Sequence, residues 1–208
     1  MSISDRYSSW AATYDQDPNL TRDLDQRATG ELLAGRRFAS ILELGCGTGK
    51  NTRLLAGLAP RVLALDFSPG MLELARAKLA GAGHVSFAAA DLTQPWPCDD
   101  AGADLIICNL VLEHIADLGW IFAEARRVLQ PGGAFLVSEL HPFKQYLGSA
   151  ANFRRGGEQI SIPAFTHHLS DFTAAAEGAG LALAGLREWW DNDDRALPPR
   201  LLTLVFKG

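Results

Sequence analysis

Alternating glycines behind an acidic residue are the part of this chain best suited to binding a small molecule. The run from Glu43 to Gly49 reads E-L-G-C-G-T-G, with glycine at positions 45, 47 and 49 directly after a short apolar segment. Glycine lets a backbone turn sharply and approach a ligand closely. The carboxylate of Glu43 would repel a pyrophosphate, but it can help to bind a cationic ligand.

Two familiar phosphate-binding loops resemble this run, but each requires residues that the chain lacks. A P-loop follows G-x-x-x-x-G-K-[ST]. Leu44 stands where its first glycine should be, and Asn51 stands at the Ser/Thr position. The dinucleotide fingerprint G-x-G-x-x-G needs a glycine where Lys50 stands. The sequence therefore disfavours a nucleoside-triphosphate site and a nicotinamide oxidoreductase.

Two aspartates follow the glycine loop at positions where nucleoside-binding folds carry acids. Asp66 stands 21 residues after Gly45, where an acid accepts hydrogen bonds from ribose hydroxyls. The alternative is that Asp66 caps the next helix, although Ser68 already suits that task. Asp91 ends a later apolar run, where its carboxylate could meet an adenine amino group; the alternative is that it caps its own loop.

These residues lie at the ends of short apolar runs, which are typical of strands covered on both faces. We predict such strands at Ile41–Leu44, Arg61–Leu65, Val85–Ala90, Asp104–Cys108 and Ala134–Glu139. Helices are predicted at Pro69–Ala80 and Leu118–Leu129, and the front segment Ile3–Leu33 is helical with a break near Pro18. Alternating strands and helices indicate a parallel, doubly wound sheet.

The C-terminal part departs from this alternation. A helix at Ser170–Ala179 is followed by two predicted strands, Leu181–Trp190 and Leu201–Phe206, whose short connection makes them antiparallel. We therefore predict an α/β fold, Rossmann-like and doubly wound, with a mostly parallel sheet of seven strands and an antiparallel edge strand. The segment His141–Thr166 reads as a long irregular loop, which in a compact domain is usually a functional lid or disordered.

Composition narrows the classes of protein further. A length of 208 residues with 48% hydrophobic side chains suits one compact domain that needs no disulfide or metal. Cys46, Cys98 and Cys108 form no C-x-x-C pair. A net charge of −5 argues against a nucleic-acid partner. Because neither a secretory signal nor a membrane span of about 18 apolar residues is present, we expect a cytoplasmic protein without a membrane partner.

Four segments, in the usual order and spacing, resemble the class I S-adenosylmethionine-dependent methyltransferases. They are Glu43–Gly49, Ala64–Ser68, Ala90–Leu92 and Val128–Gly133. The resemblance covers roughly residues 38–140 and is nearest to the small-molecule branch that includes ubiquinone/menaquinone and biotin-pathway enzymes. It implies an enzyme that transfers a methyl group from S-adenosyl-L-methionine to an O, N, C or S atom of a small-molecule acceptor.

The same resemblance assigns roles to single residues. Gly45 and Gly47 would line the methionine part of the cofactor, with Glu43 reaching towards its amino end, and the loop includes Cys46 and Gly49. The other implied cofactor contacts are Asp66 for the ribose, Phe67, Met71, Asp91 and Leu92 for the adenine, Asn109 and Leu110 beside the sulfonium, and Tyr14 closing over the cofactor. For Tyr14, an ordinary aromatic of an amphipathic helix remains the alternative.

The domain organisation follows from these assignments. Residues 1–208 are read as a single methyltransferase domain. Within it, residues 1–37 form an N-terminal helical cap, 38–140 the cofactor-binding core, 141–168 a substrate lid, and 169–208 a C-terminal helix and β-hairpin. The aromatic residues Phe143, Tyr146, Phe153 and Phe165 suggest an apolar acceptor under this lid, although simple lid packing explains them equally well.

A general base is needed when the acceptor must lose a proton, and histidine is the natural base near pH 7. His141 follows the fifth strand and is a candidate base or substrate ligand. His168 precedes the C-terminal helix, where packing at the helix start is the alternative. His114 follows the fourth strand, where it more often shapes the loop than acts as a base. No metal site is predicted, because the spacing of these histidines lacks supporting carboxylates.

Other readings remain open at this point. A nucleic-acid amino-methyltransferase would show N-P-P-[YF] after the fourth strand, whereas this chain has Asn109-Leu110-Val111-Leu112. A protein methyltransferase, or a non-catalytic cofactor-binding or assembly protein, is a further alternative, although the acids of the cofactor motifs are all present. The acceptor and the oligomeric state, monomer or homodimer, are left open.

Overall fold

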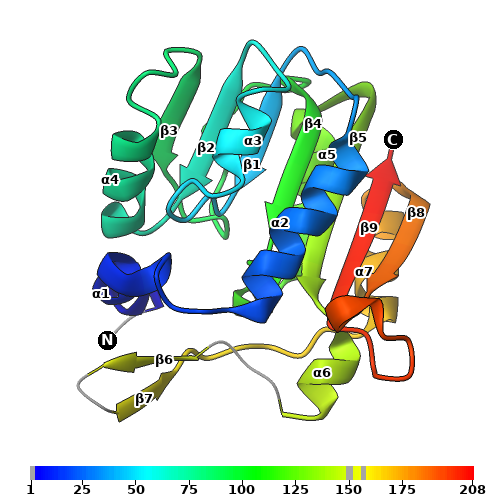
Figure 1. Ribbon diagram of the computed structural model, residues 1–208. Helices are drawn as coiled ribbons and strands as arrows, with labels where there is room; N and C mark the ends of the chain where they lie inside the picture. The colour runs from blue at the N-terminus through cyan, green and yellow to red at the C-terminus, as the bar shows by residue number, and fades with distance from the viewer. Residues whose placement is uncertain (1–2, 149–151, 156–157) are drawn as a thin grey trace.

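The computed structural model describes residues 3–148, 152–155 and 158–208, with the backbone alone for residue 12 and for the segments 152–155 and 158–161. Figure 1 shows a central sheet with helices on both faces and with further small elements gathered at one end of its strands. None of the helices in the described ranges combines the length and the apolar character that crossing a membrane requires.

Seven strands form the sheet in the order β3-β2-β1-β4-β5-β9-β8. Their bounds are β1 Ile41–Leu44, β2 Val62–Asp66, β3 Val85–Ala89, β4 Ala103–Asn109, β5 Leu129–Leu140, β8 Ala182–Trp189 and β9 Leu201–Lys207. The first five strands pair in parallel, and β9 runs antiparallel to both of its neighbours, β5 and β8. This arrangement confirms the predicted Rossmann-like sheet that is mixed at one edge.

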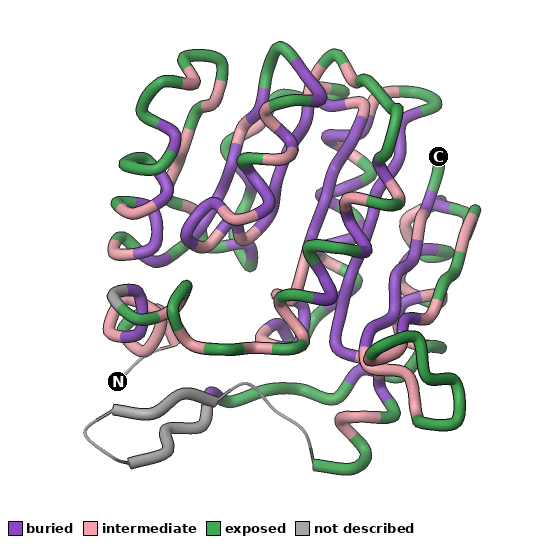
Figure 2. The backbone as a smooth tube through the Cα atoms, viewed as in Figure 1, coloured by how far each residue is buried: buried purple, intermediate pink, exposed green. Residues whose placement is uncertain are grey.

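Helices cover both faces of the sheet and bury its inner strands, whereas the edge strands β3 and β8 are mostly half-buried or exposed (Figure 2). On one face lie α2 (Leu20–Leu33), α3 (Thr52–Leu55) and α4 (Pro69–Lys78), packed against the alternate apolar residues of the strands. On the other face lie α5 (Leu118–Val128) and α7 (Leu169–Gly178) around a core of three phenylalanines, Phe122, Phe135 and Phe206. Burial of such large apolar side chains is the main stabilising term of the fold.

The predicted elements agree with the structure to within a few residues, with one difference in the core. The glycine loop leads into α3, a helix of four residues. Strand β5 begins at Leu129 rather than Ala134, because Leu129 already pairs with Ala103 ahead of a register shift. Gly133 allows this pairing, since a β-carbon there would lie 3.0 Å from the carbonyl oxygen of Asp104.

The predicted irregular loop after β5 is the main error in the fold prediction. It contains α6 (Pro142–Tyr146) and two short antiparallel strands, β6 (Asn152–Arg155) and β7 (Glu158–Ser161). Helix α6 forms because Pro142 occupies its first turn and the Nδ1 atom of His141 accepts a hydrogen bond from the backbone N–H of Phe143. Figure 1 shows α1 (Ile3–Tyr14), α6 and the β6–β7 hairpin together beyond the carboxyl ends of the parallel strands.

Candidate functional site

A cavity of about 270 Å³, here called the first cavity, lies at the carboxyl ends of β1, β2 and β4. This is the edge where open α/β sheets bind ligands, because the loops after the strands converge there. Most of the residues predicted to contact the cofactor line it: Tyr14, Gly45, Gly47, Asp66, Phe67, Met71, Asp91, Leu92, Asn109 and Leu110. Glu43, Cys46 and Gly49 are not among the lining residues.

The glycines at positions 45 and 47 act in different ways. Both have a positive φ, +71° for Gly45 and +53° for Gly47, which other residues rarely adopt. A β-carbon at Gly45 would collide with Cγ2 of Val111, so this glycine permits the loop after β4 to approach closely. At Gly47 no described protein atom lies within 4 Å of that position, which leaves open space beside the cavity.

Asp66 ties the end of β2 to the glycine loop. Its Oδ2 accepts a hydrogen bond from the backbone N–H of Gly47, and its Oδ1 accepts one from that of Ser68, both at 2.8 Å. The side chain is buried, and this burial raises the pKa of the carboxyl above its ordinary value. Helix α4 is capped by Ser68 itself, whose Oγ accepts from the N–H of Met71, as the sequence analysis expected.

The loop after β3 brings Asp91 and Leu92 to the same cavity. Asp91 is exposed, and its Oδ1 accepts hydrogen bonds from the backbone N–H and the hydroxyl of Thr93 at 2.9 and 2.7 Å. Asp91 therefore caps its own loop, which the sequence analysis gave as the alternative to adenine binding. It also lies on the wall of the first cavity. The carbonyl oxygen of Leu92 accepts from the indole N–H groups of Trp96 and Trp120.

Asn109, at the end of β4, belongs to a buried polar network centred on Asp25. The Nδ2 of Asn109 donates to Asp25 at 2.7 Å and to Thr29 at 2.9 Å. Asp25 also accepts from Nδ2 of Asn51 and from the hydroxyl of Ser138. The Oδ1 of Asn109 is buried without a partner among the described residues. Because Asp25 engages the amide nitrogen, the oxygen is the end of the Asn109 amide that is left as a free acceptor.

Asp25 was missed by the sequence analysis, although its position carried a signal. Helix α2 buries Leu24, Asp25, Ala28, Thr29 and Leu33. A carboxylate and a hydroxyl on an otherwise apolar buried face require partners, because unpaired buried polar groups are costly. Burial also raises the pKa of Asp25 above its ordinary value.

Glu43, the acid ahead of the glycine loop, is turned to an internal partner. Its Oε2 accepts a hydrogen bond of 2.6 Å from the hydroxyl of Thr52, and only 4% of the residue is exposed. Burial raises the pKa of this carboxyl to about 8, so it is largely neutral at pH 7. The structure thus places Glu43 beneath the loop rather than on the cavity wall.

Two aromatic residues of α1, Tyr7 and Tyr14, line the first cavity, and Trp10 lies beside both of them. Tyr7, Trp10 and Tyr14 share one helix face, and the ring centroids of Trp10 and Tyr14 are 4.7 Å apart. Tyr7 also lies 6.2 Å, centroid to centroid, from Phe67. Tyr7 was not selected from the sequence, but its spacing from Trp10 and Tyr14 indicated a common face.

His114 lines the first cavity with both ring nitrogens engaged. Its Nδ1 lies 3.0 Å from the carbonyl oxygen of Pro163, which can only accept, so Nδ1 carries the proton. Its Nε2 then accepts the hydroxyl proton of Tyr7 at 2.8 Å. Burial lowers the pKa of His114, which keeps the ring neutral near pH 7.

The other two candidate bases lie away from the first cavity. The Nε2 of His141 is 3.0 Å from Oε1 of Glu188, and its Nδ1 caps α6. The Nδ1 of His168 is 2.7 Å from the hydroxyl of Tyr146, in front of α7. Neither histidine lines the first cavity or the second cavity described next.

A second cavity, of about 430 Å³, adjoins the first and shares Tyr7, Tyr14 and Leu110 with it. Its wall comes from α1, from the start of α2, from the turn after β4 and from the start of β9. Its polar lining consists of Asn19, Thr21, Arg22, Glu113 and Arg200.

The predicted lid aromatics whose side chains the structure describes, Phe143, Tyr146 and Phe165, do not line this second cavity. Phe143, Tyr146 and Phe165 are each about half exposed. The side chain of Phe153 lies outside the described part of the chain, so its predicted role is not addressed by the structure.

Comparison with known proteins identifies the family. The family described as "Methyltransferase domain" matches residues 42–137. An uncharacterized methyltransferase of Emericella nidulans is 32% identical over 86% of this chain and 76% of its own length. A malonyl-[acyl-carrier protein] O-methyltransferase of Serratia marcescens is 36% identical over 66% of this chain, and the match spans only 52% of that enzyme. The solved DhpI-SAM-HEP complex superposes with a TM-score of 0.74 at 25% identity, covering 98% of this chain and 95% of that chain.

The fold, the cavity and these relatives lead to one assignment. Three of the four segments that resemble the family, Glu43–Gly49, Ala64–Ser68 and Ala90–Leu92, contribute residues to one cavity, at the sheet edge where Rossmann-like proteins bind nucleosides. The match to the fungal relative extends over most of both chains. This chain belongs to the class I S-adenosylmethionine-dependent methyltransferases.

Proposed function

We propose that this chain binds S-adenosylmethionine in the first cavity and transfers its methyl group to a small molecule held in the second. The observation that carries this proposal is the junction of the two cavities at Tyr7, Tyr14 and Leu110. A donor in one cavity and an acceptor in the other would meet there without crossing solvent. Holding two reactants in line can supply on the order of 7–11 kcal/mol of the barrier reduction.

The residues of the first cavity fit this cofactor. Asp66 ends β2 at the position of a ribose-binding acid, and Phe67 and Met71 offer apolar surface to the adenine. Asp91 and Leu92 stand where the adenine edge would lie. The empty position beside Gly47 gives a nucleoside room that any side chain would fill.

The methionine end of the cofactor carries an ammonium group, and Asn109 supplies a matching acceptor. Its Oδ1 is buried, lacks a protein partner in the described structure and belongs to a residue of the cavity wall. We assign this atom the role that the sequence analysis gave to Glu43. Asp25 acts as a positioning residue, because it binds the amide nitrogen and so keeps the oxygen free.

The bound cofactor supplies a methyl group that is already activated by its positively charged sulfur. The chain therefore has to align the acceptor and exclude water. The aromatic face of α1 serves this purpose beside the junction, and we propose that α6 and the β6–β7 hairpin form the substrate lid over residues 141–168. His114 then orients Tyr7 and does not serve as the base.

We also propose that the enzyme acts in the cytoplasm on a free metabolite rather than on nucleic acid. The net charge of −5 supports this, because a binder of phosphate backbones gains its affinity from positive charge.

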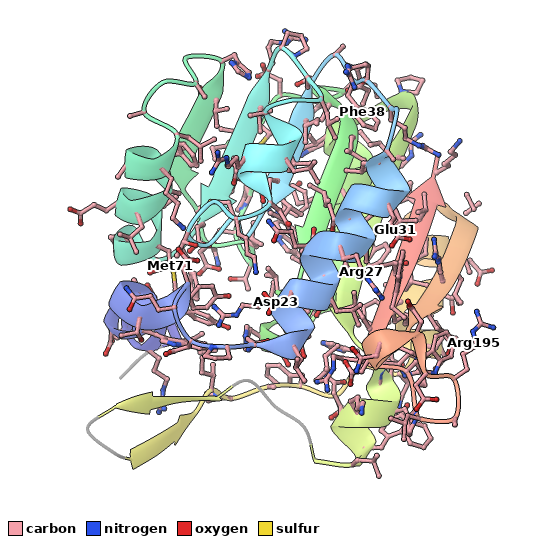
Figure 3. The ribbon with its side chains drawn as sticks, viewed as in Figure 1. Asp23, Arg27, Glu31, Phe38, Met71 and Arg195 are labelled. Carbon is pink, nitrogen blue, oxygen red and sulfur yellow. The ribbon has the colours of Figure 1, made fainter. Side chains whose placement is uncertain are left out.

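Calorimetric titration with S-adenosylhomocysteine tests the cofactor assignment. Asp66→Ala should weaken binding by about 3 kcal/mol, or about a hundredfold in Kd, through loss of charge-assisted hydrogen bonds to the ribose. Asp66→Asn keeps the size of the side chain and covers the case in which the alanine variant fails to fold. Asp23→Ala, an exposed aspartate of α2, is the matched control (Figure 3). Unchanged affinity in both Asp66 variants would refute the ribose role.

Methyl transfer itself is tested with radiolabelled S-adenosylmethionine and a panel of metabolites. Conversion of any small acceptor would support the proposed reaction. Tight cofactor binding without transfer to any member of a broad panel would favour the non-catalytic alternative.

A further inference from the structure

Apart from the carboxyl groups of Asp91 and Glu113, the walls of the two cavities offer little that could deprotonate an acceptor. Among the described lining residues His114 is the only histidine, and both of its nitrogens are engaged. Asp66 accepts two backbone hydrogen bonds and lies at the ribose position. An acceptor that is already an anion at neutral pH would need no base for its methylation.

Arg22 gives the second cavity a positive charge. Its guanidinium carbon lies 3.9 Å from the ring centroid of Tyr14, and its NH1 and NH2 groups donate to the backbone carbonyl oxygens of Tyr14 and Asp17. No carboxylate in the described ranges forms an ion pair with it. Arg200, on the same wall, is instead bound to both carboxylate oxygens of Asp191. Arg22 therefore presents the cavity with a cation that no ion pair neutralises.

Glu113 gives the same wall a carboxyl group with a free oxygen. The residue is 6% exposed, and its Oε2 is buried without a partner among the described residues. The side chain of Gln145 donates a hydrogen bond to this carboxyl group, and Oε1 lies 3.7 Å from Nε2 of His114. A buried carboxyl group in this setting is held as the neutral acid more readily than in water, and the acid can donate from Oε2.

We propose that the second cavity binds an acceptor through a carboxylate group, with Arg22 supplying charge and Glu113 donating a hydrogen bond, and that this carboxylate oxygen is methylated. The inference rests on the proposed function, because the methyl donor must occupy the first cavity.

The reaction balances without help from a base. A carboxylate oxygen attacks the methyl carbon, so an O–C bond forms while the C–S bond breaks and its electron pair stays on sulfur. The products are a methyl ester and S-adenosylhomocysteine, and no proton is released. An anion and a cation are converted to neutral groups, which a cavity of low dielectric favours.

The groups around Glu113 set the pH dependence of acceptor binding. The titratable and charged groups that face it are Tyr7 from α1, His114 from its own turn, Glu139 from β5, and Arg22 and Arg200 across the cavity. Burial raises the pKa of Glu139 to about 8, raises that of Tyr7 well above its ordinary value and lowers that of His114. Below pH 7 this leaves the two arginines as the charged members of the set.

Burial raises the pKa of Glu113 to about 7. Above that pH the residue becomes an anion, loses its donor and repels a carboxylate, and ionisation of Glu139 adds to the repulsion. Affinity for a carboxylate should therefore be greatest below pH 7. It should fall by about tenfold for each pH unit above it.

Binding to the protein saturated with S-adenosylhomocysteine tests the proposal independently of turnover. The probes are benzoate, phenylacetate and glutarate, each compared by calorimetry with its neutral amide between pH 6 and 9. We expect at least one acid to bind more than about tenfold better than its amide, with the stated loss of affinity at high pH.

Three variants separate the contributions. Glu113→Gln keeps a hydrogen-bond donor that does not ionise, so the affinity for the acid should lose most of its pH dependence. Arg22→Gln should lower the affinity for the acid by more than about tenfold and leave that for the amide unchanged, while Arg22→Lys restores part of it. Arg195→Gln is the matched control, since Arg195 lies beside Trp190 near β8 and lines neither cavity (Figure 3). Thermal unfolding of each variant checks its fold.

Four results would overturn the inference. Acids that bind no better than their amides, or that gain affinity as the pH rises, would contradict it. So would a failure of every acid to bind to protein that still binds S-adenosylhomocysteine. An increase of kcat/KM through pH 7 with a hydroxyl acceptor, abolished in Glu113→Gln, would identify Glu113 as a general base instead. Loss of S-adenosylhomocysteine binding itself would count against the first-cavity assignment, which keeps the two proposals distinguishable.

Discussion

The two adjoining cavities of this protein are built in different ways. The first is formed by the loop after β1, the end of β2, the loop after β3 and the end of β4, so most of its wall follows the order of the chain between Gly45 and Ile115. The second combines α1 and the start of α2 with Glu113, Leu140 and Arg200. A cavity made by successive strand ends leaves a motif in the sequence, whereas one assembled from distant segments does not.

The largest loss of stability is expected at Gly45, a residue that lines the first cavity and also packs against Val111 in the loop after β4. Gly45→Ala places a β-carbon against Val111 at a positive φ, so we expect a loss of about 3 kcal/mol in the free energy of unfolding. Chemical denaturation measures it. Gly35→Ala has nearly the same φ, +72°, but nothing within 4 Å, and should lose only about 1 kcal/mol. Equal losses in the two variants would show that backbone strain, not the contact with Val111, matters at Gly45.

Gly47 separates binding from folding within the same loop. A β-carbon at Gly47 has no described protein atom within 4 Å, so for Gly47→Val we expect about 1–2 kcal/mol of destabilisation, mainly from the positive φ. The affinity for S-adenosylhomocysteine should fall by more than about a hundredfold, because the side chain fills the space meant for the ligand. Calorimetry and thermal unfolding measure the two effects. Normal turnover in a folded Gly47→Val protein would contradict the assignment of the first cavity.

Asp25 tests whether α2 contributes to the first cavity through Asn109. Asp25→Asn should weaken S-adenosylhomocysteine binding by about 1 kcal/mol, since the amide of Asn109 is no longer held in one orientation. Methylthioadenosine, which lacks the amino-acid part, is the comparison ligand and should bind as it does to the wild type. If both ligands lost affinity equally, Asp25 would have a general structural role and not one directed at the ammonium group.

The smallest change in stability and activity is expected for a substitution at His141, which lines neither cavity. His141→Ala removes the cap of α6 and the contact with Glu188, at a cost of about 0.5–1 kcal/mol in stability. Burial lowers the pKa of His141, so its loss should not alter a pH–rate profile near pH 7 through a missing charge. Steady-state kinetics on an identified acceptor provides the measurement. A large drop in kcat would make His141 a candidate base again. It would also indicate that the acceptor site reaches from the second cavity to α6.

Sequence patterns predicted the sheet well because its central parallel strands, β1, β2, β4 and β5, are apolar runs that are buried on both faces. They failed after β5, where α6 and the β6–β7 hairpin are short elements with little apolar periodicity. The site shows the same division. Gly45, Asp66 and Asn109 follow strands directly and were predicted to meet, whereas the histidines His141 and His168 were placed near the ligand by chain position alone.

Residue patterns along the chain were enough to predict the strands, the glycine loop and the acid after β2, because these depend on local turns and on burial that neighbouring residues dictate. The pairing of the buried polar groups could be read only from the folded molecule. Glu43 is paired with Thr52 and Asn109 with Asp25, while Oε2 of Glu113, on the same cavity wall as Arg22, has no partner among the described residues. These pairings join helices and strands far apart in the chain, and the desolvation that sets their ionisation exists only once those elements have packed.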